Sequence, residues 1–233
     1  MNRIEALRSR GISCALYDDP INIRYLTGYT GEGSLLILPD RAVIITDFRY
    51  IEQAQRQSPF CGVERTEGDR GANAIIAEAL ESAGIHDLPI EENIVTVSRL
   101  RAMEKALPGI HLTALPETVL EMRTVKDEGE LDCIRKALAI SCQAFDDLLG
   151  VIHAGMTEKR ACAELNHFMN LRGSEGNAFD TIVASGVNGS LPHAVPSDKV
   201  IEKGDLVTFD FGAKKVRYLN AGGPEPLCFA RSD

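Results

Sequence analysis

The sequence has no excess of basic residues, no long apolar run and no closely spaced cysteine pair. Its net charge is −9 and its isoelectric point is about 5.1, so neither a nucleic acid nor an anionic membrane surface is expected as a partner. No apolar stretch approaches the roughly 20 residues of a membrane-spanning helix. The opening residues, MNRIEALRSRG, are typical of a short amphipathic helix and not of a secretion signal. Export is therefore not expected.

The cysteines point to the same conclusion. No two of them form a C-x-x-C pair, so zinc held by cysteine has little support. Several occupy apolar positions of strand or helix patterns, which is typical of reduced, buried thiols in a cytoplasmic protein. The six cysteines are Cys14, Cys61, Cys133, Cys142, Cys162 and Cys228.

The first half of the chain alternates between strand and helix patterns. Residues 34–47, SLLILPDRAVIITD, predict two apolar strands joined by a turn at Pro39, Asp40 and Arg41. Residues 72–84 predict a helix that ends at Gly84. Further strands are expected at 12–18, 88–93 and 110–115, and further helices at 48–57 and 96–109. This alternation predicts an α/β domain with helices on the faces of a mixed or parallel sheet.

The pattern changes near residue 121. The charged segment EMRTVKDEGE lacks a clear apolar period and is interpreted as a hinge. A long amphipathic helix follows and is expected to end at Gly155, and Thr157 is expected to cap a second helix. Strands are predicted at 179–185 and 205–213, with a long loop between them. The apolar face of the long helix is predicted to contain Ile134, Leu138, Ser141, Phe145, Leu148 and Ile152.

Asp210 lies between two phenylalanines near the end of an apolar strand, in DLVTFDFGA. Strand alternation places Leu206, Thr208 and Asp210 on one face. A carboxylate there costs free energy unless something compensates its charge. Two interpretations are open: a partly exposed aspartate that caps the turn at Gly212, or a metal ligand or catalytic carboxylate.

His193 lies in SLPHAVP, a loop rich in proline and glycine, and is therefore not on the core face of a helix. It is either a solvated loop histidine or a hydrogen-bond partner and proton donor to a substrate. The other four histidines show no H-x-x-x-H or H-E-x-x-H spacing, and no functional role is assigned to them.

Four segments together resemble the Xaa-Pro aminopeptidase, prolidase and creatinase group of metallohydrolases. They are NIRYLTGY, LLILPDRAVIITDFRYIEQA, EMRTVKDEGELDCIRKALAI and GNAFDTIVASGVNGSLPHAVPSDKVIEKGDLVTFDFGA. Each is weak alone, but they occur in the right order and at the right intervals, and the resemblance extends from residue 1 to about residue 213.

The resemblance implies a creatinase-type α/β domain at 1–121, a hinge at 122–126, and an incomplete "pita-bread" α+β metallopeptidase domain at 127–233. By the same resemblance Asp210 is the first ligand of a pair of divalent metals, which would be manganese, cobalt or zinc. His193 lines the substrate site. The implied substrate is a peptide with proline at its second position, and family members are often homo-oligomers.

The chain departs from the family pattern after Asp210. Ala221 stands eleven residues later, where the family has a second aspartate, and the segments that carry a histidine and two glutamates are missing. The chain is therefore expected to be inactive as it stands. The alternatives are a non-catalytic folded fragment that serves in binding or assembly and, for an intact form, creatinase-like hydrolysis of a small C–N bond. The tail from Gly222 to Asp233 is expected to be loosely placed.

Overall fold

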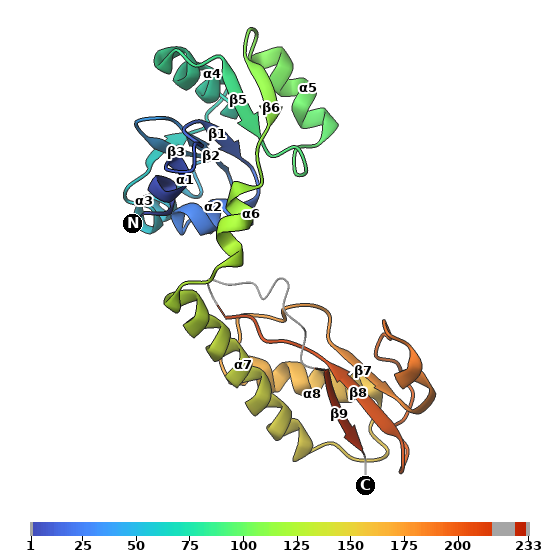
Figure 1. Ribbon diagram of the computed structural model, residues 1–233. Coiled ribbons are helices and arrows are strands. Elements are labelled where there is room, and N and C mark those ends of the chain that lie inside the picture. The colour runs from blue at the N-terminus through green and yellow to red at the C-terminus, as the bar shows by residue number, and fades with distance from the viewer. Residues whose placement is uncertain (1, 216–226, 232–233) are drawn as a thin grey trace. The chain divides into compact units, whose positions relative to one another are not determined.

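The protein folds as two compact units, Met1–Val125 and Lys126–Asp233. The structure is a computed structural model that describes residues 2–215 and, as backbone, residues 227–231 (Figure 1). Among the described helices, none combines the length and the apolar character needed to cross a membrane.

Unit 1 is built on a six-stranded sheet with the order β4-β3-β2-β1-β5-β6. Strand β2 is antiparallel to both of its neighbours, whereas the other neighbouring pairs are parallel. The mixed sheet that the sequence predicts is therefore present. Its strands are β1 (Ala15–Tyr17), β2 (Ser34–Ile37), β3 (Ala42–Thr46), β4 (Gly62–Arg65), β5 (Asp87–Ile90) and β6 (His111–Ala114).

Helices cover both faces of this sheet because successive residues of each strand point to opposite sides. Tyr17 belongs to a buried cluster with side chains of α1, α2, α3 and α6, whereas Leu16 belongs to a second cluster with side chains of α4 and α5. Both side chains are almost fully buried. The helices are α1 (Arg3–Arg8), α2 (Pro20–Thr27), α3 (Ile51–Gln57), α4 (Ala72–Ala83), α5 (Val97–Ala106) and α6 (Thr118–Thr124).

Two of these helices were not expected from the sequence. Helix α2 begins at Pro20 behind the N-cap Asp19, whose side chain accepts a hydrogen bond from the backbone N–H of Ile21. Helix α6 is helical to Thr124, so most of the segment expected as a hinge at 122–126 belongs to a helix. Its short apolar stripe gives no clear period in the sequence, but Val119 and Met122 are buried in the core.

Unit 2 is a three-stranded antiparallel sheet, ordered β7-β8-β9, with two helices packed on one face (Figure 1). Thr157 caps α8 as predicted, with its side chain 3.2 Å from the backbone nitrogen of Arg160. The elements are α7 (Glu128–Leu149), α8 (Glu158–Leu171), β7 (Ile182–Ser185), the short 3₁₀ helix η1 (Gly186–Ser190), β8 (Leu206–Asp210) and β9 (Leu227–Arg231).

Most of the predicted apolar face of α7 is confirmed, since Ser141 and Leu148 are buried and Phe145 packs on the core, but the helix differs from the prediction at one residue and in its end. Leu138 is exposed, whereas Ile140 and Ala144 are buried. The helix ends at Leu149 with Gly150 as its C-cap, before Gly155. The prediction left out Ile140 and Ala144, which share a buried cluster with side chains of α8 and β8.

Strand β9 overturns part of the expectation for the tail. Residues Leu227–Arg231 pair antiparallel with all of β8, from Leu206↔Arg231 to Asp210↔Leu227. The exposed backbone groups at the edge of a sheet are a template for a further strand. Pro224 and Pro226 precede β9 in the sequence and so do not interrupt its ladder. The rest of the tail, 216–226 and 232–233, lies outside the described residues.

Candidate functional site

Asp210 is the last residue of β8 and lies on the face opposite the hydrophobic core. Val207 and Phe209 are buried beneath the strand, whereas Thr208 and Asp210 are half-buried. The Phe145 ring of α7 meets the Phe209 ring edge-on, with their centroids 5.3 Å apart. This packing fixes the orientation of the strand. The alternation predicted from the sequence is confirmed.

The chain beyond Asp210 is held in place by contacts from two other segments. The backbone N–H of Ala213 donates to Ser141 Oγ of α7 over 3.0 Å, and the N–H of Ala178 donates to the carbonyl of Gly212 over 2.8 Å. A Cβ on Gly212 would lie only 3.2 Å from the Ala178 Cβ and a ring carbon of Phe179. The residues that directly follow Asp210 are therefore closely packed against α7 and against the segment at Ala178 and Phe179.

His193 is exposed in the loop between η1 and β8. It lies in a turn in which the N–H of Ala194 donates to the carbonyl of Leu191 over 3.2 Å. The preceding helix η1 lies beside β7 and β8. The position of a Cβ on Gly189 would be 3.4 Å from Thr208 Oγ1. Helix η1 thus contacts the Thr208 and Asp210 side of the sheet, and His193 follows it by three residues.

Glu158, which no sequence pattern singled out, is a fully buried carboxylate at the first position of α8. Its Oε1 accepts hydrogen bonds from the backbone N–H of Ser185 (2.7 Å), Ser185 Oγ (2.9 Å) and Asn188 Nδ2 (3.1 Å). Its Oε2 accepts from the N–H (3.1 Å) and the Oγ (2.7 Å) of Ser197. The carboxylate therefore joins three segments that flank or form the loop of His193.

Burial alone would raise the pKa of the Glu158 carboxyl. The hydrogen bonds from Ser197, Ser185 and Asn188 outweigh burial and hold this pKa below its usual value. Glu158 is therefore ionised at neutral pH. A buried carboxylate that accepts several N–H and O–H groups is stable, because each donor replaces a lost water.

Lys199 closes the same region from the other side. Its Nζ lies 2.7 Å from Asp205 Oδ2 and 3.0 Å from Ser185 Oγ. The Lys199 ammonium holds the pKa of the Asp205 carboxyl below its usual value. A Cβ on Gly186, which has φ of 54°, would stand 2.7 Å from Asp205 Oδ1. Glycine is thus required where the chain leaves β7.

Each of the two units matches the model of a known protein family. Residues 2–125 match the Creatinase/Prolidase N-terminal domain, and residues 132–220 match Metallopeptidase family M24. The chain belongs to the creatinase/prolidase family of metallopeptidases. Asp210 and His193 both lie within the M24 match.

Relatives and solved structures of this family agree with the fold. The chain is 38% identical to the "Uncharacterized peptidase YqhT" of Bacillus subtilis, covering 91% of this chain and 61% of that protein. It is 30% identical to the "Xaa-Pro dipeptidase" of Pyrococcus horikoshii, covering 92% and 60%. The X-Pro aminopeptidase structure from Thermotoga maritima superposes with a TM-score of 0.83 at 35% identity, covering 91% and 61%. The chain thus spans about 60% of the length of these relatives.

The fold expected from the resemblance is confirmed. The chain combines a creatinase-type α/β domain with part of a pita-bread domain, and its structural relatives include prolidases. M24 peptidases are metal-dependent. Whether this chain can bind a metal ion therefore depends on which ligand side chains lie near Asp210. A carboxylate is a suitable donor for hard or borderline cations.

The described residues do not by themselves fit a two-metal centre. Within residues 2–215, no three His, Cys, Asp or Glu side chains are grouped so that they could hold a metal ion. One carboxylate is too few, because a stable site needs several converging ligands. Ala221, where the family pattern places a second aspartate, lies outside the described residues.

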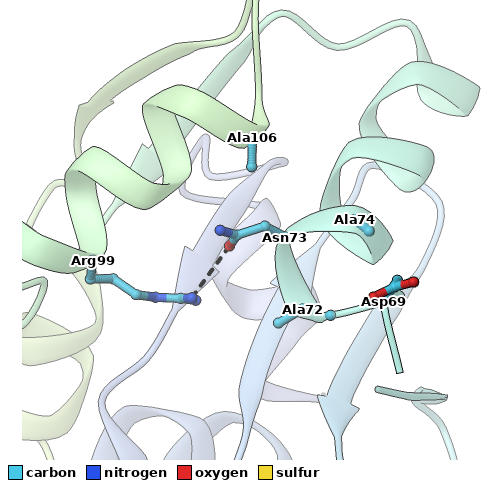
Figure 2. A pocket seen from close by; sticks show the side chains of 7 residues that line it. Asp69, Ala72, Asn73, Ala74, Arg99 and Ala106 are labelled. Atoms are coloured by element: carbon cyan, nitrogen blue, oxygen red, sulfur yellow. Dashed lines mark hydrogen bonds between the residues drawn. The ribbon is translucent and has the colours of Figure 1, made fainter. Parts of the chain in front are cut away.

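A separate hollow of about 370 Å³ lies in unit 1, beside the start of α4 (Figure 2). Arg99 of α5 reaches toward it, and its Nη1 donates to Asn73 Oδ1 over 3.3 Å. The Arg99 Nε is also 3.2 Å from Asp18 Oδ2. Its guanidinium is thus already bound within the protein, and neither Asp210 nor His193 lines this hollow. Unit 2 remains the candidate site.

Proposed function

We propose that this chain supplies the N-terminal domain and part of the catalytic domain of a metal-dependent peptidase that cleaves Xaa-Pro bonds. The observation that carries the proposal is Asp210, a half-buried carboxylate at the end of β8 within the M24 match. Its strand is fixed from below by Phe209 and Phe145, so the carboxylate is presented on the opposite face. The name of the Pyrococcus horikoshii relative, "Xaa-Pro dipeptidase", supports the substrate class.

Asp210 is proposed as one ligand of a pair of divalent cations in the intact enzyme. Manganese, cobalt or zinc would serve, and carboxylate-rich ligation favours manganese. His193 is proposed to contact the peptide substrate. This chain alone is proposed not to hold the metal pair stably and to be inactive, because no three His, Cys, Asp or Glu side chains within the described residues are grouped to hold a metal ion.

Two other functions stay open as proposals. Each unit has its own buried core, which supports a stable module that serves in binding or assembly. Exposed Val187 and Val195 in unit 2 offer apolar surface for a second copy of the chain. Creatinase-like hydrolysis of a small C–N bond is the alternative for the intact form. The thiols of Cys14, Cys61 and Cys162, none of which forms a disulfide, support a cytoplasmic location.

The division into domains is also a proposal. We place the domains at 1–121 and 127–233 and the hinge at 122–126. Because helix α6 continues to Thr124, the support for a hinge within this segment comes from the exposed Val125 and Lys126, between α6 and α7. Limited trypsin digestion should cut between Arg123 and Lys126 and leave a stable N-terminal fragment. Uniform degradation with no such fragment would refute it.

Manganese titration followed by NMR tests the role of Asp210 directly. Mn²⁺ broadens the signals of nuclei near its binding site, so the amides of 208–212 should broaden first in the wild-type chain and not in Asp210→Asn. Asp198→Asn is the matched control, since Asp198 is an exposed aspartate of the same unit. Equal broadening in wild type and Asp210→Asn would exclude Asp210 as a ligand.

Peptide hydrolysis tests the proposed inactivity. The 233-residue chain with added Mn²⁺ should release no residue from a Xaa-Pro peptide and should not hydrolyse creatine. Metal-dependent release that Asp210→Asn abolishes would show instead that the chain is an active enzyme.

A further inference from the structure

The loop that carries His193 is attached to the rest of unit 2 at its two ends. We define the His193 loop as residues 186–199, which leave β7 after Ser185 and return beside the start of α8. Leu191, His193 and Val195 near its middle are all exposed. Ala194, between the last two of these, is buried, so the path of the loop depends on this inward contact and on how its two ends are held.

Both ends are held by the Glu158 carboxylate. One oxygen accepts the N–H and Oγ of Ser185, at the start, and the other accepts the N–H and Oγ of Ser197, near the end. Asn188 of η1 lies between them and donates to both oxygens, over 3.1 and 3.2 Å. A single carboxylate therefore connects the start and the end of the loop through hydrogen bonds.

Backbone contacts place Glu158 itself. Its N–H donates to the carbonyl of Lys199 over 3.0 Å, and the next N–H, of Lys159, donates to the carbonyl of Ser197 over 3.1 Å. These donors belong to the first turn of α8, where N–H groups have no partner within the helix. The helix start and the carboxylate therefore hold the same stretch of the loop.

We infer that Glu158 is a positioning residue that closes the His193 loop at both ends and so sets where His193 stands relative to the Asp210 face of the sheet. The relevance of this position to catalysis rests on the proposed role of His193. The holding of the loop does not, and it can be measured without turnover.

The two oxygens make the inference specific. In Glu158→Gln only one oxygen remains, and the new NH₂ group faces the donors of one serine. That variant should release one end of the loop and keep the volume of the buried side chain. Glu158→Ala leaves the N–H groups of both Ser185 and Ser197 without an acceptor and should release both ends.

Hydrogen exchange of the full 233-residue chain tests the inference. Peptides covering 186–199 should exchange about 10- to 100-fold faster in Glu158→Gln, the factor expected when a hydrogen bond to a charged group is lost. Peptides of α7 and of unit 1 should keep wild-type rates. The matched control is Glu164→Gln, on the same helix, where the carboxylate is bonded to Arg160 at the surface.

The His193 ring gives a second measurement, one that a general loss of stability would not change. Its NMR signal, assigned with His193→Gln, should move toward the position of an unstructured histidine in Glu158→Gln but stay in place in Glu164→Gln. Unchanged loop exchange in both Glu158 variants would overturn the inference. So would an equal increase across α7, α8 and the loop, because Glu158 would then support the whole core. Neither outcome depends on peptidase activity, so the proposed function is tested separately.

Discussion

Truncation of Phe209 should destabilise unit 2 selectively. The Phe209 side chain is fully buried and packs edge-on against Phe145, and Asp210 follows it directly. Replacement of a buried phenylalanine by alanine costs about 3–5 kcal/mol through lost burial and the remaining cavity. The contact with Phe145 accounts for about 0.5–1.5 kcal/mol of that.

Such a loss is large for a unit of this size, because whole domains are stable by only about 5–15 kcal/mol. The sequence has no tryptophan, so peptide-resolved hydrogen exchange in increasing urea is the suitable assay. In Phe209→Ala, peptides of α7, α8 and β8 should lose protection at much lower urea, while peptides of unit 1 keep their wild-type midpoint.

Phe48→Ala is the control, because the Phe48 side chain is 70% exposed and its removal should change stability by less than about 0.5 kcal/mol. A loss below about 1 kcal/mol for Phe209→Ala would refute the packing argument. An equal loss in both units would refute their independence.

Three further changes have defined outcomes. Ser141→Ala should cost about 1–3 kcal/mol in urea unfolding of unit 2, because the buried N–H of Ala213 loses its acceptor; wild-type stability would contradict this. Asp127→Ala, which breaks the capping box with Glu130, should cost about 0.5–2 kcal/mol and speed exchange in the first turn of α7. The folded-state pKa of Glu158 lies below its usual 4.5, so its stabilisation is present above pH 4.5 and is lost as the pH falls through the folded value. Acid titration of unit 2 should therefore be steeper for wild type than for Glu158→Gln, and identical curves would contradict it.

The sequence identified the strand and the helix caps because these depend on neighbouring residues. Alternation along 205–213 placed Asp210 opposite Phe209, and the structure confirms it. At the start of α7, Asp127 and Glu130 form a capping box, which likewise depends on residues only three apart. Helix α2 also has a local signal, since Asp19 followed by Pro20 is typical of a helix start.

Features that depend on distant segments were missed or misplaced. The apolar period of α7 showed that one face is buried, but only the position of α8 and β8 selected Ile140 over Leu138. The glycines and prolines of the tail predict a loosely placed segment, yet the open edge of β8 pairs with β9. In both cases the burial or the pairing was decided by another segment of the same unit, which lies far away in the sequence.

The amino-acid sequence by itself determined the family, the α/β character of the first unit and the two candidate residues, Asp210 and His193. The family and fold are shown by the matches, and the roles of the two residues remain proposals. Only the tertiary structure revealed Glu158. Its hydrogen-bond partners Ser185 and Ser197 lie 27 and 39 residues away along the chain. A buried carboxylate can be ionised there because the fold brings enough donors to one point to replace its water, and no local pattern records that convergence.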